Sequence, residues 1–299
     1  MDIEKQLTNN IQEILSNTSP SVYYYLLVDS TFFNGVEKFT CTTKFLNQTY
    51  KNLYEDFSEN LKNNGALLFQ FNNDDIKNYY DDLQGIIEVG AFNFIVSDFD
   101  FENLSDHLED LMEVIQPNGK SALFRFQDNF ALDATLTSID LKNFQKILSY
   151  KIKNWIWQSP DNKIYKVKNT VNYLKKNFTL KFSDIEFSKI SQKLRPLRLM
   201  PLMKAFDPDL ESLKFFELYD LVEERILAAD GLAFKSFEDI TLYSLLSYKF
   251  GDQFINEEPF KTAYLKMKFN EMSFQDSTDE IDLEQLDNWE LNRKDKINV

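Results

Sequence analysis

The spacing of apolar residues in the first half of the chain switches repeatedly between that of strands and that of helices. Continuous or alternating apolar runs predict strands at residues 22–29, 66–71, 92–97 and 121–126. Apolar positions three or four residues apart predict helices at residues 1–15, 45–62, 74–88, 101–115 and 129–150. The runs at 152–157 and 163–168 predict a further hairpin. Strands and helices therefore alternate in this half, which predicts a mixed lobe with a central sheet.

The second half of the chain has helical spacing almost throughout. Asp207 followed by Pro208 is typical of the start of a helix, and Gly231 is typical of a helix end. After about Met272 the chain becomes acidic, and we expect residues 275–299 to form a mobile tail or one loosely docked helix.

These patterns together predict an α+β protein in which a mixed α/β lobe precedes a mainly α-helical lobe. We expect a mixed lobe at residues 1–160, a basic connecting segment at 161–206, a helical lobe at 207–270 and an acidic C-terminal tail at 271–299.

Charge is distributed unevenly along the chain, whose formal net charge is −15. Residues 1–150 carry 10 Lys or Arg against 23 Asp or Glu, residues 151–206 carry 13 against 3, and residues 207–299 carry 10 against 22. An acidic surface repels phosphate, so we expect no nucleic-acid partner. The basic middle segment either packs against its acidic neighbours or forms a docking surface for an acidic partner.

Other features of the sequence indicate a folded cytoplasmic protein. The 28 Phe and 14 Tyr can fill a core, and a single cysteine cannot form an internal disulfide. The first residues lack the basic-then-apolar order of a signal peptide. The sequence also contains no window that approaches the roughly 18 apolar residues of a membrane span, so we expect no membrane insertion.

The residues available for catalysis are few. The only histidine, His107, and the only cysteine, Cys41, lie far apart in the sequence. The sequence has no phosphate-binding glycine loop, zinc-ligand spacing or serine elbow. We therefore expect a protein that is not an enzyme and that needs no cofactor or metal.

Arg125 and Asp128 form the first candidate site. Arg125 alternates with Phe124 and Phe126 on the predicted strand, and a guanidinium buried there would need a carboxylate partner. Asp29, at the end of the first predicted strand, is a suitable partner. The pair is either an internal ion pair or a contact with another protein. In the alternative function, a metal-dependent hydrolase or nuclease would use Asp29 and Asp128 with Arg125.

Over roughly residues 20–268 the sequence resembles a known family, the bacterial type VI secretion effector adaptors, also called effector chaperones, and two parts carry most of this resemblance. The strand YLLVD, which ends at Asp29, resembles their opening strand. The run LSDHLEDLMEVIQPNGKSALFRFQD resembles their most recognisable block, in which a helix with a His-Leu pair precedes a glycine turn and a strand with Arg-Phe-x-Asp. The corresponding residues here are His107, Leu108, Gly119, Arg125, Phe126 and Asp128. The chain departs from that pattern at Gln127, where the family usually has an aromatic residue, and at Asn129, where it usually has proline.

The resemblance implies a non-enzymatic cytoplasmic adaptor that binds a toxin effector and delivers it to the VgrG spike of the secretion machine. Basic and aromatic residues of the middle segment would then be candidates for effector binding, whereas packing between the lobes is the structural alternative. These candidates are Lys163, Lys166, Lys168, Lys175, Lys176, Phe178, Phe182, Arg195 and Arg198. Single-stranded nucleic acid could also use such a mixture, although the net acidic charge opposes it.

Overall fold

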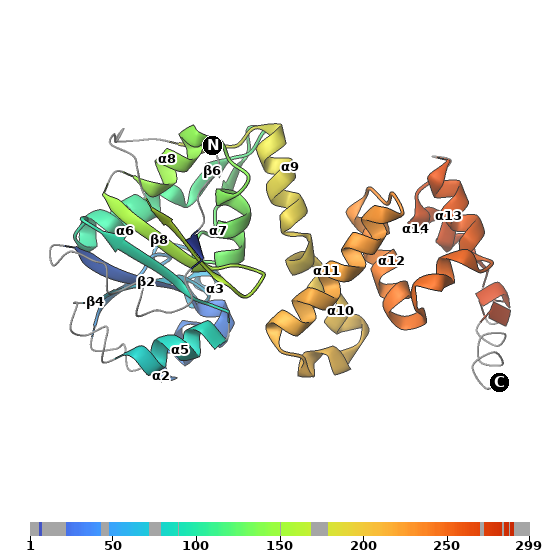
Figure 1. Ribbon diagram of the computed structural model, residues 1–299, viewed down its shortest axis with the longest axis horizontal. Helices are drawn as coiled ribbons and strands as arrows, with labels where there is room; N and C mark the ends of the chain where they lie inside the picture. The colour runs from blue at the N-terminus through green and yellow to red at the C-terminus, as the bar shows by residue number, and fades with distance from the viewer. Residues whose placement is uncertain are drawn as a thin grey trace. The chain divides into compact units, whose positions relative to one another are not determined.

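The computed structural model of the chain describes residues 6–7, 22–42, 48–71, 79–88, 90–149, 151–168, 179–269, 272–282, 284–286 and 288–289. The chain divides into two compact units, Met1–Leu194 and Arg195–Val299 (Figure 1). This division falls inside the segment 161–206, which we expected to connect a mixed lobe and a helical lobe. As predicted, the first unit contains the sheets and the second is helical.

Strands of the first unit form two sheets. Their bounds are β1 Gln6–Leu7, β2 Tyr23–Asp29, β3 Thr49–Asn52, β4 Ala66–Phe71, β5 Asn93–Ser97, β6 Glu113–Ile115, β7 Ser121–Leu123, β8 Ile152–Gln158, β9 Ile164–Lys168 and β10 Leu180–Lys181. The large sheet has the order β1-β9-β8-β5-β2-β4-β3, and every neighbouring pair in it is antiparallel. The small sheet has the order β10-β6-β7. The predicted hairpin is present as β8 and β9.

Helices cover both faces of the large sheet (Figure 1). The helices of this unit are η1 Ser30–Phe33, α2 Val36–Thr42, α3 Glu59–Asn63, α5 Tyr80–Glu88, α6 Phe101–Leu111, α7 Asn129–Leu136, α8 Leu141–Leu148 and α9 Asp184–Lys193. One core cluster joins a sheet face to α6, α7 and α8, and the other joins the opposite face to α2 and α5. Because β2 lies between these layers, all its residues after Tyr23 are buried, as its continuous apolar run predicts.

The structure corrects several element boundaries. Residues 45–62, predicted as a helix, include strand β3, which pairs with β4, and Tyr50 of this strand stacks on Phe69. The expected helix at 1–15 is wrong at residues 6–7, which form β1, while its other residues lie outside the described ones. The expected helix at 129–150 is two helices, because Asp140 caps a new helix by accepting from the Asn143 N–H.

The second unit consists of helices around one core. Their bounds are α10 Arg195–Phe206, η3 Pro208–Ser212, α11 Phe215–Gly231, α12 Phe237–Phe250, η4 Asp252–Asn256, α13 Phe260–Lys268 and α14 Phe274–Asp279. Asp207 does cap a helix, but that helix is the short 3₁₀ segment η3, and α11 begins later. No helix in the described part of the chain is long and apolar enough to cross a membrane.

The described residues after 272 are part of this core, although we expected a mobile tail or a loosely docked helix there. Phe274 is fully buried, and the Trp289 ring packs edge-on against Phe250 and Phe260. The Trp289 indole N–H also donates to Glu257 at 2.8 Å. The acidic composition of this stretch therefore conceals apolar residues that anchor it.

Candidate functional site

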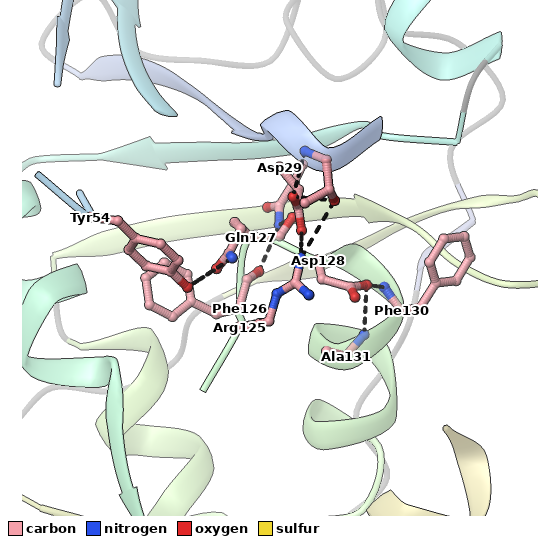
Figure 2. A network of polar contacts seen from close by, with 10 residues as sticks. Asp29, Tyr54, Arg125, Phe126, Gln127, Asp128, Phe130 and Ala131 are labelled. Atoms are coloured by element: carbon pink, nitrogen blue, oxygen red, sulfur yellow. Dashed lines mark hydrogen bonds and ion pairs between the residues drawn. The ribbon is translucent and has the colours of Figure 1, made fainter. Parts of the chain in front are cut away.

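Arg125 and Asp29 form an ion pair between the segment after β7 and the end of β2. Nη2 of Arg125 lies 2.6 Å from Oδ2 of Asp29 (Figure 2). The Asp29 side chain is completely buried, whereas the Arg125 side chain is 43% exposed. The sequence predicted Asp29 as the partner of Arg125, and the structure shows this pair.

The second carboxylate oxygen of Asp29 is also bonded. Oδ1 accepts from the Thr31 N–H at 3.0 Å and from the Thr31 hydroxyl at 2.6 Å, so that Asp29 caps η1. Burial of a carboxylate is costly unless its oxygens keep hydrogen bonds and a nearby positive charge. Arg125 and Thr31 together meet both conditions.

Asp128 lies beside this pair and caps helix α7. Its Oδ1 accepts from the N–H groups of Phe130 at 2.9 Å and Ala131 at 3.1 Å (Figure 2). Desolvation, with repulsion from Asp29, raises the pKa of Asp128 to about 6, against the opposing effect of Arg125 and the helix N–H groups. Asp128 thus lies in the electrostatic field of both Asp29 and Arg125, and its own pKa is raised toward neutral pH.

The chain between Arg125 and Asp128 passes through the core. The Phe126 ring is fully buried and packs edge-on against Trp155, while its carbonyl accepts from the Asn93 amide at 2.9 Å. The Gln127 amide donates to the Tyr54 hydroxyl at 2.8 Å (Figure 2). Burial raises the pKa of Tyr54 to about 12, so this hydroxyl stays protonated.

Sequence reasoning missed the buried polar residues that support this segment. Asn93 accepts from the Trp155 indole at 2.6 Å, and the Asn129 amide donates to the carbonyls of Gly90 and Gln158. A lone asparagine within an apolar strand is the signal that could have identified Asn93. Gln127 and Asn129 are the two departures from the resembled pattern, and here both bond to buried partners.

His107 lies inside the first unit, on helix α6. Its Nε2 is 3.0 Å from the carbonyl of Ile147 on α8, and its ring stacks on Phe99. Burial lowers its pKa, so the ring is neutral at pH 7 and Nε2–H is the donor to this carbonyl. This geometry ties two helices together.

The candidate binding residues of the first unit are only partly described. Lys163 is exposed and lies 3.1 Å from Asp161, and Lys166 on β9 is partly buried. Lys168 ends β9, and its side chain is not described. Lys175, Lys176 and Phe178 lie outside the described residues.

The remaining candidates make internal contacts. Phe182 is buried and packs edge-on against Phe124, so its ring belongs to the core and cannot contribute to an exposed binding surface. In the second unit, Arg195 forms two hydrogen bonds with Asp230, at 2.8 and 2.6 Å. The Arg198 guanidinium lies 4.0 Å from the centroid of the Phe237 ring.

The carboxylates of this site fit a metal poorly. Among the residues that the structure describes, no three His, Cys, Asp or Glu side chains are grouped as a metal site requires. Hydrogen bonds occupy both oxygens of Asp29 and one oxygen of Asp128. These contacts hold the end of β2, the turn at 124–128 and the start of α7 together.

Comparison with known proteins finds a match to a family model. The model of the family described as "Domain of unknown function (DUF4123)" matches residues 24–146, which is less than half of the chain. This family is generally associated with type VI secretion effector adaptors. No curated protein and no solved structure matches the chain. The matched residues run from β2 through α8 and include Asp29, Arg125 and Asp128, so the part of the chain similar to this family contains the whole ion-pair site.

Proposed function

We propose that this protein is a non-enzymatic cytoplasmic adaptor, which binds a toxin effector of a type VI secretion system and delivers it to the VgrG spike. The observation that carries the proposal is the match of residues 24–146 to a family associated with such adaptors. The match begins one residue into β2 and ends within α8, so it covers the strands and helices that the ion-pair site joins.

The geometry of Asp29, Arg125 and Asp128 supports a structural role for these residues within an adaptor. A catalytic carboxylate must present an oxygen to its substrate, whereas Asp29 is fully buried and its oxygens contact Arg125 and Thr31. The site then maintains the fold of the lobe, and an adaptor binds its partner through other surfaces.

The alternative is a metal-dependent hydrolase or nuclease that uses Asp29 and Asp128 with Arg125. The raised pKa of Asp128 is the one observation that favours it, because perturbed carboxylates are frequent in active sites. Such an enzyme should gain thermal stability from Mg²⁺ or Mn²⁺, and the gain should disappear in D29N. An adaptor predicts no metal-dependent shift in either protein.

Affinity purification from the bacterium that encodes the chain tests the adaptor role. A tagged copy should co-purify with a secreted toxin and with a VgrG spike protein, both identified by mass spectrometry. A chain with the same tag that lacks Arg195–Val299 would show which unit holds each partner. Recovery of neither component under conditions that preserve other secretion complexes would contradict the proposal.

Lys163 and Lys166 of the β8–β9 hairpin allow a direct test of the proposed effector surface. K163E/K166E should weaken toxin capture if the toxin presents an acidic segment, and the effect should shrink as salt rises. K261E/K268E, on exposed positions of α13, makes the same charge change in the second unit. Equal capture by wild type and K163E/K166E would exclude this hairpin from the effector contact.

A further inference from the structure

A groove separates the end of β3 from the hairpin of β6 and β7. It has a volume of about 420 Å³. It is lined by residues 51–53 and 55–57, by residues 121–123 of β7, and by the C-terminal part of α6 together with Met112 and the start of β6. All of these elements belong to the first unit.

Among the residues that the structure describes, none pairs with the outer side of strand β7. In the small sheet it is the last strand, and only β6 pairs with it. The bonds from the Gln116 N–H to the Lys120 carbonyl and from the Phe124 N–H to the Met112 carbonyl show which residues of the hairpin form hydrogen-bonded pairs. Because such pairs alternate along antiparallel strands, Ala122 bonds to β6, while the main-chain groups of Ser121 and Leu123 point away from it.

The lining of the groove combines an apolar floor with an acidic rim. Leu53 and Met112 are buried, Leu123 is partly buried and the Phe57 ring is 41% exposed. Four carboxylates and one ammonium group also line it: Glu55, Asp56, Glu109, Glu113 and Lys51.

The only cation of that set is already neutralised. Lys51 lies 2.5 Å from Glu109, so it does not offset the other three carboxylates. An extended strand directs alternate side chains to opposite sides. A partner segment that alternates basic and apolar residues therefore matches both the apolar and the acidic residues of the groove. Its apolar residues would contact the floor, and its lysine or arginine residues would reach the rim.

We propose that this groove binds an extended, basic segment of another protein, which adds to the outer edge of β7 as a further strand. Main-chain hydrogen bonds to Ser121 and Leu123 would supply part of the affinity, and the acidic rim would select basic partners. The inference rests on this groove and goes beyond the adaptor role, so it can hold whether or not the partner is a secreted toxin.

A synthetic peptide tests the main-chain part of the proposal on the unmodified protein. The probe is a fluorescein-labelled peptide of roughly eight residues, a typical strand length, that alternates lysine and valine. Fluorescence anisotropy should show saturable binding. The same peptide with an N-methyl group on every residue has no main-chain N–H to donate at either edge, and it should bind at least roughly tenfold more weakly. Equal binding of both peptides, or no binding of either, would overturn the proposal.

A proline at position 121 tests the location. S121P removes the outward N–H of β7 but leaves the bonds of Ala122 to β6, so the hairpin should keep its pairing. Peptide affinity should fall several-fold relative to S121A, which also loses the hydroxyl bond to Glu113 but keeps the main-chain donor. Comparable melting temperatures of S121P and S121A would show that the lobe is intact. If S121P then bound the peptide as well as S121A, the strand would not add at β7.

The charge of the rim can be reversed at exposed positions. E55K/D56K should weaken binding of the lysine-valine peptide more than tenfold at low ionic strength, and less in high salt. E223K/E224K, on exposed positions of α11 in the second unit, changes the net charge equally and should bind the peptide like wild type. Equal loss in both variants would mean attraction to the acidic protein as a whole, and would overturn a specific groove.

Discussion

At the scale of single residues, the central feature is the ion pair of Arg125 with Asp29, which lies beside a second carboxylate, Asp128. Asp29 is fully buried and bonded at both oxygens, and Asp128 caps α7 beside it. The sequence predicted the Arg125–Asp29 pair because a strand arginine among phenylalanines needs a carboxylate. It did not predict Asn93, Tyr54 and Gln127 around the pair, because hydrogen bonds between distant segments leave no periodic signal.

Replacement of Arg125 by methionine should destabilise the first unit. The change leaves the buried Asp29 carboxylate without its cation. We expect a loss of about 2–4 kcal/mol in the free energy of unfolding, which is less than for a fully buried ion pair because Arg125 is partly exposed. R125K keeps the charge and should recover part of that loss. Urea denaturation measures both, and an R125M protein as stable as wild type would contradict the structural role of the pair.

Replacement of Asp128 by asparagine should change how stability depends on pH. The folded protein raises the pKa of Asp128 from 3.8 to about 6, so it binds this proton more tightly than the unfolded chain does. The stability contributed by this group is therefore present below pH 3.8 and is lost as the pH rises through 6. D128N keeps a capping oxygen but cannot ionise.

The stability of D128N relative to wild type should therefore increase between pH 4 and pH 7, by about 1–3 kcal/mol in total. Melting temperatures at several pH values in that window measure this difference. A difference that stays constant with pH would mean that Asp128 is not the group that titrates there.

At the scale of elements, a strand was predicted correctly where its own apolar pattern determines its conformation, and incorrectly where pairing with a distant segment determines it. Strand β2 is buried on both faces, so its apolar run alone identified it. Strand β3 is short and lies at the edge of the sheet. Its conformation depends on pairing with β4, and the apolar spacing of residues 45–62 does not reveal that pairing. Strand β7 lies within the strand predicted at 121–126 but ends at Leu123. Strand β6 occupies the end of the helix predicted at 101–115, because pairing with β7 decides its conformation.

Trp289 offers a test at this scale. W289A should destabilise the second unit by about 3–4 kcal/mol, because a large ring is removed from contacts with Phe250 and Phe260. W289F keeps most of the ring contact and should cost less. Chemical denaturation followed by circular dichroism measures the change. If W289A left the unfolding transition unchanged, the C-terminal stretch would behave as the loose tail that its composition suggests.

At the scale of the whole molecule, the family match covers part of the first unit and does not extend into the second. The match ends at residue 146, so the β8–β9 hairpin and all the helices from α9 onward lie outside it. The helical character of the second half was predictable from its apolar spacing. The position of the division at Leu194 was not, because the basic segment 161–206 continues across it without a change in composition.

The adaptor role assigns different tasks to these parts. The matched unit would provide what adaptors have in common, and the segments outside the match would provide recognition of one particular toxin. Secretion by the bacterium that encodes the chain tests this claim most directly. Deletion of the gene should abolish release of the cognate toxin while release of the spike and tube components continues, and a plasmid copy should restore it. Unchanged toxin release after deletion would contradict the account.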